Sequence, residues 1–381
     1  MEGLVYHRLL AELRPILLGG RLDKIHQVSD LEICLVLRNA GKNHRLILSA
    51  SPSHPGFHLA GAAPGRTTGT PSGFCLLARR HLIPGTISAL TQSGWERVIH
   101  LHCVSRDELG RRREPRLILE LMGKHSNLIL VEGETETILG ALKLVPAEKS
   151  SVRQVLPGRR YVLPPAGERL DTVSVTRETL LGTLRRIVID SFQREWPSIL
   201  PACFTGIGQL GAREICWRAG VDQRKKTAET TPEEMERLAD QLLAVRDDVL
   251  NGRTAPVLIR AGAAPVLITS GTAASGQGLP QDAWIQPLGH LPPERQEPCP
   301  DLVQATAFLQ EQLRSCDDTL HKLQQLRRLI NQSFRRARRL ESALSMELEE
   351  GKRAEFYRRC GELVLANLNL IVPRTDKAAL T

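Results

Sequence analysis

The feature that most constrains the fold is a series of short apolar segments between residues 98 and 142, each bounded by turn-forming residues. The segments are Val98–Val104, Leu117–Leu121, Leu128–Val131 and Ile138–Leu142. Each has the length of a β-strand and is too short for an ordinary helix. We therefore predict that the centre of the first domain, residues 1–170, is rich in β-structure.

Two helices and further strands are predicted on the N-terminal side of this region. Apolar residues recur at helical spacing over residues 4–17, and Gly19 supplies a typical helix C-terminus. A second helix is expected over residues 73–82, because the hydroxyl of Ser72 can cap its first turn. Residues 31–49 contain two strand-like segments that are expected to pair. The first domain is thus mixed.

The sequence Gly206-Ile207-Gly208 lies within a helical pattern that covers residues 171–253. Ala212 follows at the spacing of a helix-hairpin-helix motif. In this motif the glycines turn the backbone at the start of a helix, where free N–H groups can bind a phosphate. The alternative is a plain turn between two helices.

The rest of the chain shows two further patterns. Residues 254–302 are rich in Gly, Pro, Ala and Ser, with strand-like pieces at Pro256–Ile259 and Pro265–Thr269. They are predicted to form a return segment and linker without assignable chemistry. Residues 303–350 carry apolar side chains at coiled-coil spacing with one local irregularity, and residues 351–381 are expected to begin another segment.

A strongly basic group lies in the predicted coiled-coil helix and includes Arg335, Arg336, Arg338 and Arg339. No acidic residue interrupts it. A solvated helix face is one interpretation, and a contact with the phosphates of RNA is the other.

Charge and cysteine content narrow the class of protein. The 381 residues carry a formal net charge of +9, which suits a phosphate-binding protein but also an ordinary basic surface. Eight scattered cysteines without a Cys-X-X-Cys pair predict reduced thiols. No apolar run approaches the roughly 20 residues of a membrane span. A cytoplasmic location is therefore expected.

Motifs of enzymes and cofactor-binding proteins are not recognisable in the sequence. It has no P-loop, no dinucleotide-binding Gly motif, no zinc-protease motif and no serine-hydrolase motif. His100 and His102 alternate along one predicted strand, so a metal pair is conceivable, but no third ligand is apparent. We expect neither catalysis nor a cofactor nor a bound metal.

A polar run joins two of the predicted strands. It contains Glu120, Leu121, Met122, Lys124 and His125. A carboxylate, a flexible Met, a cation and hydrogen-bonding groups suit the recognition of a polar, anionic ligand better than a core. The alternative is a simple turn.

Several motifs, taken in order and spacing, resemble the NFACT family. They are Phe74–Leu82, Gln92–Val98, the polar run, Leu156–Tyr161 with Pro164-Pro165, and Tyr357–Asn367. The resemblance extends to about residue 371 and implies a multi-domain α+β fold. It also implies an N-terminal domain similar to that of formamidopyrimidine-DNA glycosylases, followed by a helix-hairpin-helix domain and the start of a coiled coil. Glu2 stands where those glycosylases carry their proline nucleophile, so glycosylase activity is not expected.

The resemblance further implies a function on the ribosome. Family members bind large ribosomal subunits that are obstructed by a stalled peptidyl-tRNA. They recruit tRNA, alanyl-tRNA in the bacterial case, so that the stalled chain is extended without mRNA. The partners expected for this chain are therefore tRNA and the large subunit, with the basic group at 335–339 against ribosomal RNA. No membrane partner is expected.

Residues of the expected tRNA site follow from the same resemblance. The family's functional Asp-Arg pair matches Glu96 and Arg97. The Glu-apolar-Met element matches Glu120, Leu121 and Met122, with Lys124 and His125 after it, and Arg79 and Arg80 add cations on the short helix. Glu replaces the family's Asp at positions 2 and 96, and Lys124 stands where Arg is commoner.

Two further expectations remain. Bacterial members of the family were often labelled fibronectin-binding proteins, so a surface adhesin is the alternative function. One coiled-coil helix has no returning partner before residue 381, so the sequence is expected to be an N-terminal fragment of a longer protein.

Overall fold

The computed structural model divides the chain into two compact units, Met1–Ser315 and Cys316–Thr381. It describes residues 1–61, 70–150, 152–165, 167–191, 193–262, 279–374 and 377–380. The predicted strand-like piece Pro265–Thr269 lies outside these residues.

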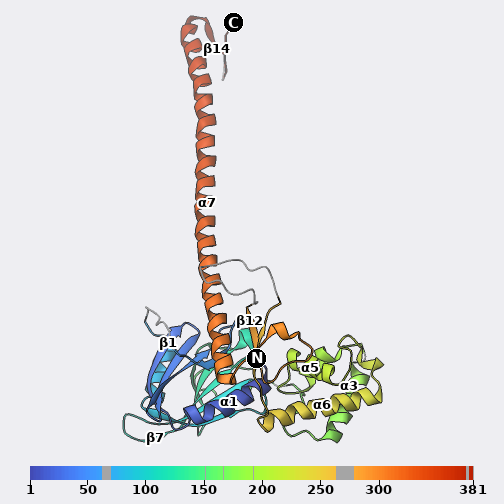
Figure 1. The fold of residues 1–381 in the computed structure, drawn as a ribbon. Coiled ribbons are helices and arrows are strands. Elements are labelled where there is room, and N and C mark those ends of the chain that lie inside the picture. The colour runs from blue at the N-terminus through green and yellow to red at the C-terminus, as the bar shows by residue number, and fades with distance from the viewer. Residues whose placement is uncertain are drawn as a thin grey trace. The chain divides into compact units, whose positions relative to one another are not determined.

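A 10-stranded antiparallel sheet dominates the first half of the first unit (Figure 1). Its strands are β1 (Arg21–Ser29), β2 (Glu32–Asn39), β3 (Lys42–Ser49), β4 (Gly56–Leu59), β5 (Gly85–Gln92), β6 (Val98–Arg106), β7 (Arg112–Arg113), β8 (Pro115–Glu120), β9 (Asn127–Glu132) and β10 (Ile138–Ala141). The order is β10-β9-β8-β6-β5-β1-β2-β3-β4, with β7 paired to β6. Only Arg21 and Leu22 join β1 to β5, so two antiparallel halves meet there.

Alternation along the strands sends apolar side chains to both faces of the sheet. Leu117 and Leu119 of β8 belong to the main core together with helix α1 (Gly3–Leu17). Ile118, between them, belongs to a second cluster that the chain segment around Tyr161 closes. Because successive side chains point to opposite faces, β8 is covered on both sides. Each fully buried leucine contributes about 1.5–3 kcal/mol to the stability of the fold.

The predicted elements of this domain are confirmed. Helix α1 ends before Gly19, which has a φ of 75°. Helix α2 (Gly73–Leu82) starts after Ser72, whose Oγ accepts a hydrogen bond from the Cys75 N–H at 3.3 Å. The strand-like segments within residues 31–49 pair as β2 and β3.

Helices form the second half of the first unit (Figure 1). They are α3 (Arg177–Asp190), α4 (Trp196–Cys203), α5 (Gln209–Arg218) and α6 (Pro232–Leu250). A capping box of Thr231 and Glu234 starts α6, which packs on α3 and α5. A small antiparallel sheet follows, of β11 (Val257–Arg260), β12 (Pro280–Trp284) and β13 (Gln296–Pro298).

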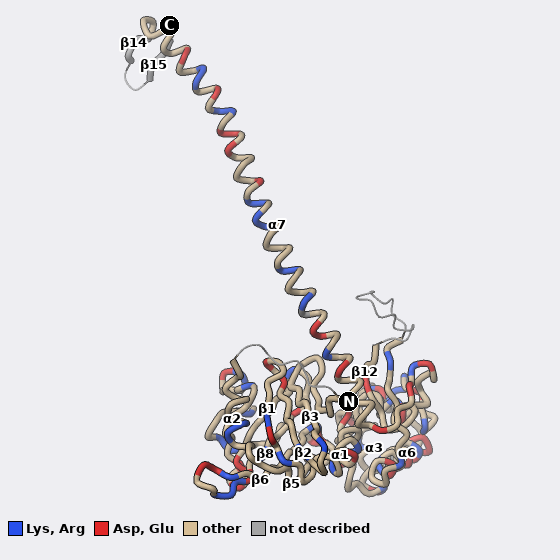
Figure 2. Tube along the Cα trace, turned by 60° about the vertical axis from the view of Figure 1, so that its left-hand side comes forward, with Lys and Arg blue, Asp and Glu red and all other residues tan. Residues whose placement is uncertain are grey.

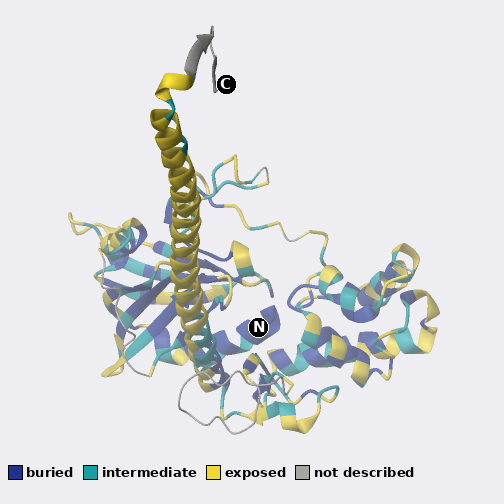
Figure 3. Ribbon diagram, turned by 90° about the horizontal axis from the view of Figure 1, so that it is seen from above, coloured by how far each residue is buried: buried dark blue, intermediate teal, exposed yellow. Residues whose placement is uncertain are grey.

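Helix α7 (Leu302–Ala366) is longer than the sequence pattern predicted. The expected end near residue 350 is wrong, because residues 352–366 contain no proline and several good helix formers, and the helix continues through Gly351 and Gly361. Its part after Cys316 is exposed almost throughout (Figure 3), including Leu323, Ile330 and Phe334. The predicted coiled coil stays a prediction. A hairpin of β14 (Ile371–Arg374) and β15 (Lys377–Leu380) follows.

The described part of the chain contains no helix that is both long and apolar enough to cross a lipid bilayer. The eight cysteines, all of which lie within that part, are free.

Candidate nucleic-acid interface

Two of the sequence-predicted site segments meet at one end of the sheet. β6 starts at Val98, which pairs with Glu120 at the end of β8. One residue further out, the Leu121 N–H donates a hydrogen bond to the Arg97 carbonyl oxygen at 2.9 Å. A short 3₁₀ helix, η1 (Gly123–His125), then leads into β9. Residues 96–97 and 120–125 are thus neighbours, and we call this place the Arg97 strand end.

Arg97 and Glu96 have different surroundings. Within the residues that the structure describes, the exposed guanidinium of Arg97 makes no hydrogen bond or ion pair. The Glu96 carboxylate instead pairs with Arg169 at 2.7 Å, and both side chains are partly buried. In this structure the guanidinium that reaches the Glu96 carboxylate is that of Arg169 and not that of Arg97.

Glu120 and Leu121 lie inside the protein. The Glu120 carboxylate is 4% exposed and accepts hydrogen bonds from Arg153 at 2.6 Å and from the Tyr161 hydroxyl at 2.9 Å. Burial raises the pKa of Glu120, and the Arg153 guanidinium opposes that rise. Because both side chains are covered, a ligand at this strand end would meet their neighbours instead.

Those neighbours are Lys124 and His125, both exposed on η1. Met122 is half-buried against the cluster of Tyr161. The turn is held from within, since Ser126 Oγ accepts the Met122 N–H at 2.8 Å and Gly123 has a φ of 57°. The polar run of the sequence therefore divides into buried residues that build the turn and exposed residues that can meet a ligand.

The arginines of α2 do not join this strand end. Arg80 pairs with Glu108 at 3.5 Å, beyond the other end of β6. The nine residues of β6 separate the two places by roughly 26 Å. Arg79 is half-buried and donates to the Ile25 carbonyl oxygen at 2.8 Å. Arg79 and Arg80 therefore lie apart from Arg97, and their part in the expected tRNA site stays a prediction.

The turn Gly206-Ile207-Gly208 connects α4 to α5 and packs against the start of the chain. Gly206 has a φ of 78°, and a Cβ there would lie 2.5 Å from the Trp95 Cβ. Its carbonyl oxygen accepts the Leu4 N–H at 3.1 Å. Close packing thus explains why residue 206 is a glycine without reference to any ligand.

An internal carboxylate occupies the N–H groups at the start of α5. Glu2 accepts from Gly208 at 2.6 Å, from Leu210 at 2.8 Å and from Gly211 at 3.2 Å. Burial raises the pKa of Glu2 to about 7, although the backbone donors of Gly208 and Gly211 oppose it. A phosphate at Gly206, Ile207 and Gly208 would have to displace this carboxylate, because both anions bind the free N–H groups at the same helix N-terminus.

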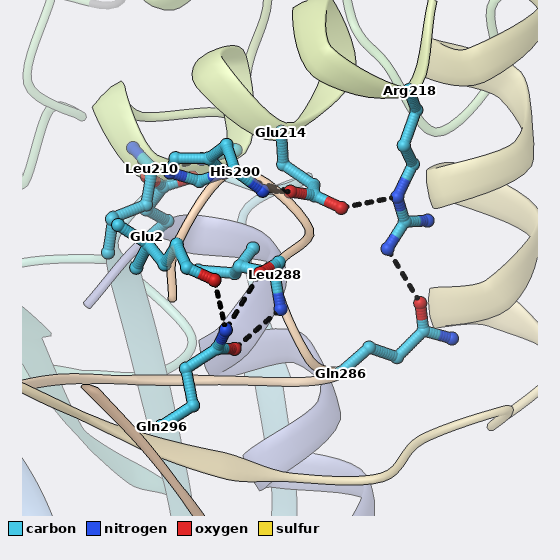
Figure 4. A network of polar contacts seen from close by, with 10 residues as sticks. Glu2, Leu210, Glu214, Arg218, Gln286, Leu288, His290 and Gln296 are labelled. Atoms are coloured by element: carbon cyan, nitrogen blue, oxygen red, sulfur yellow. Dashed lines mark hydrogen bonds and ion pairs between the residues drawn. The ribbon is translucent and has the colours of Figure 1, made fainter. Parts of the chain in front are cut away.

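A second buried carboxylate, Glu214, fixes the middle of α5 (Figure 4). It accepts from Arg218 at 2.6 Å and from His290 Nδ1 at 2.8 Å. Burial raises its pKa, but the hydrogen bonds from His290 and Arg218 outweigh burial and bring it to about 2. His290, in the segment predicted to be a linker, therefore holds α5, and this contact was not predicted because single polar residues in a Gly- and Pro-rich segment give no signal.

His100 and His102 hydrogen-bond hydroxyl groups. His100 Nε2 lies 2.8 Å from Ser93 Oγ, and His102 Nε2 lies 3.0 Å from Thr91 Oγ1. Burial lowers the pKa of both imidazoles, to about 4 for His100. In the described ranges no group of three or more potential metal-ligating side chains comes together.

The sequence model of the NFACT N-terminal and middle domains matches residues 2–381. The chain belongs to the NFACT family. It is 28% identical to a Rqc2 homolog RqcH of Bacillus subtilis (strain 168), over 99% of this chain and 60% of that protein. It is 33% identical to the Rqc2 homolog RqcH of Streptococcus suis (strain 05ZYH33), over 59% of this chain and 39% of that protein. The NFACT chain thus spans 60% or less of the length of these relatives.

A solved structure has the same fold as most of this NFACT chain. It is described as the N-terminal part of the fibronectin/fibrinogen-binding protein from Streptococcus suis. The TM-score is 0.63 at 27% identity, and the match covers 81% of this chain and 98% of that chain. The expected likeness to formamidopyrimidine-DNA glycosylases and the helix-hairpin-helix assignment stay predictions.

The second unit of the NFACT chain carries the basic group that was expected to contact ribosomal RNA. Arg335, Arg336, Arg338 and Arg339 are exposed on α7, where cationic and acidic stretches alternate (Figure 2). The Arg338 guanidinium lies 5.4 Å from the centre of the Phe334 ring.

Proposed function

We propose that this NFACT chain is part of a cytoplasmic ribosome quality-control factor that recruits tRNA to obstructed large ribosomal subunits. Alanyl-tRNA is the expected substrate, and the stalled nascent chain is extended at its C-terminus without mRNA. The peptide bond forms in the ribosome, so the factor is a recruiter and not an enzyme. The family membership and the names of the relatives support this proposal.

The observation that carries the proposal is the exposed guanidinium of Arg97, which makes no hydrogen bond or ion pair with the described residues, at the same strand end as Lys124 and His125 of η1. A free guanidinium can make a forked contact with a phosphate or a base edge. Lys124 adds a compact positive charge, and His125 adds a hydrogen-bonding ring. Three polar side chains at one strand end form a surface suited to the sugar-phosphate backbone of a folded RNA.

Substitution of Arg97 tests the proposed site. In cells that express the full-length protein, Arg97→Ala is expected to abolish alanine tails on stalled peptides, because the exposed guanidinium of this strand end is lost. Glu96→Ala is expected to abolish the tails as well, because it removes the ion pair that holds Arg169 beside Arg97. The measurement is mass spectrometry of the stalled peptides.

Arg38→Ala provides the matched control. Arg38 is an exposed arginine of β2 in the same sheet, outside the Arg97 strand end, and its loss removes the same charge. Tails should persist in this variant. Full tails in Arg97→Ala would overturn the assigned site.

Fibronectin binding is the second candidate function, favoured by the description of the Streptococcus suis structure. It requires the protein at the cell surface. Fractionation of cells that express the full-length protein separates the two functions, since predominant surface exposure supports the adhesin and co-sedimentation with large ribosomal subunits supports the recruiter.

A further inference from the structure

An open hollow of about 800 Å³ lies in the helical half of the first unit, away from the Arg97 strand end. It is formed by the start of α4, one face of α5 and the loop that follows α5. The side chains that matter for binding are Glu195, Arg213, Trp217, Asp222, Gln223 and Arg224. Its size lies within the roughly 300–1,000 Å³ that are typical of small-ligand sites. We call it the Trp217 hollow.

Trp217 differs from the other tryptophans of the chain. Its side chain is 53% exposed, whereas Trp95, Trp196 and Trp284 are no more than 2% exposed. The ring is nevertheless held in place, because a Cβ atom at Gly289 would overlap three adjacent carbons of its six-membered part. A tryptophan that is fixed on one side and open on the other offers a flat surface on which another ring can stack.

Two unpaired cations face the same hollow. The guanidinium groups of Arg213 and Arg224 are exposed and make no hydrogen bond or ion pair with any residue that the structure describes. The carboxylates have partners, since Glu195 pairs with Lys226 at 3.1 Å and Asp222 accepts the Arg224 N–H at 2.9 Å. Together with Lys226, the hollow and its rim carry three cationic side chains and two anionic ones, an excess of one positive charge. The groups left to meet a ligand are therefore an indole ring and two guanidiniums.

We propose that the Trp217 hollow binds one unpaired ribonucleotide, with its base stacked on Trp217 and its phosphate held by Arg213 and Arg224. This inference rests on the proposed function, in which the chain binds RNA. Bases in a duplex are already stacked, so a single aromatic platform selects nucleotides in loops, bulges and ends. The side-chain amide of Gln223, which also lines the hollow, supplies hydrogen-bonding groups for the base edge. The nucleotide could come from tRNA or from ribosomal RNA, which share this chemistry.

Intrinsic fluorescence tests the stacking directly, because Trp217 is the exposed one of four tryptophans. Titration of the chain with hexauridylate is expected to quench the emission to a plateau. In Trp217→Phe the quenching should disappear, while fluorescein-labelled hexauridylate still binds, as fluorescence anisotropy shows. In Trp217→Ala its affinity should fall roughly five- to a hundredfold, the loss that accompanies removal of a stacking ring.

Arginine variants test the phosphate contact. Arg213→Gln and Arg224→Gln should each weaken hexauridylate binding and reduce its dependence on salt. Arg185→Gln is the matched control, because Arg185 is exposed on α3 outside the hollow and its loss removes the same charge. Equal affinities for hexauridylate in all three variants would contradict the phosphate contact. The inference would be overturned if hexauridylate did not quench the wild-type fluorescence and Trp217→Ala bound it with unchanged affinity.

Binding of tRNA and of purified large subunits separates this inference from the proposed function and identifies the source of the nucleotide. If tRNA binds through Arg97 but hexauridylate does not quench the tryptophan fluorescence, the nucleotide site at the Trp217 hollow is excluded and the proposed function stands. If hexauridylate quenches but neither tRNA nor subunits bind, the proposed function fails. A loss of tRNA affinity in Trp217→Ala assigns the nucleotide to tRNA, and a loss of subunit affinity assigns it to ribosomal RNA.

Discussion

Glu2 is an ionisable residue that lies almost wholly inside the protein, where three backbone N–H groups donate to its carboxyl oxygens. Helix α5 has no side-chain cap of its own at Gly208. The carboxylate of Glu2 therefore serves as the cap, from a position more than 200 residues earlier in the sequence. One side chain thus joins the start of α1 to the start of α5.

Glu2 should make the stability of the protein depend on pH. Its folded pKa, about 7, lies above the ordinary value of 4.5, so the folded state keeps a proton that the unfolded state has lost. Its contribution to stability is complete below about pH 4.5 and is lost as the pH rises to about 7. Glu2→Gln should remove this loss, as urea unfolding at about pH 5 and about pH 8 would show.

The exposed Glu134, in the turn between β9 and β10, provides the control for that experiment. Glu134→Gln should leave the pH profile of the wild type unchanged. Parallel profiles for the wild type and Glu2→Gln would mean that the buried carboxyl does not titrate in this range.

At the scale of the element, the turn between α4 and α5 depends on close packing. Gly206 combines a positive φ with contact to Trp95, so two separate requirements exclude a side chain. Left-handed backbone costs an ordinary residue roughly 1–2 kcal/mol. Overfilling a packed contact costs about 1–3 kcal/mol more.

Gly206→Ala is therefore expected to lower the free energy of unfolding by about 2–5 kcal/mol, measured by chemical denaturation. Gly182→Ala is the control, because Gly182 lies within α3 with open space around its Cα. Alanine in a helix interior is favoured over glycine by about 1 kcal/mol, so this variant should gain stability. A loss of similar size in both variants would contradict the packing account.

Local patterns predicted the elements well and their contacts poorly. The Ser72 cap and the strand predicted over Leu117–Leu121 depend on neighbours in sequence, so both could be predicted. The partner of Glu96 was not, because Arg169 is distant in the sequence and nothing in either segment specifies the other. The same holds for Glu120, whose burial depends on Arg153 and Tyr161.

At the scale of the whole molecule, the net charge of +9 bears on the proposed binding of RNA. Neutralising phosphates releases condensed counterions, so the affinity for tRNA should fall steeply as salt rises. The expected slope is about 0.7–0.9 log units per log unit of salt for each neutralised phosphate. Filter binding over a series of salt concentrations measures it, and Arg97→Ala should reduce the slope by about one such contact. A flat response in the wild type would exclude electrostatic binding.

The hydrogen bond from Leu121 to the carbonyl oxygen of Arg97 fixes the backbone of residue 97 by its neighbour on β8. The guanidinium takes no part in holding that strand end together. A position of this kind can exchange its side chain at little cost to folding. A single substitution at residue 97 therefore changes the exposed chemistry of the strand end, while the sheet beneath stays the same.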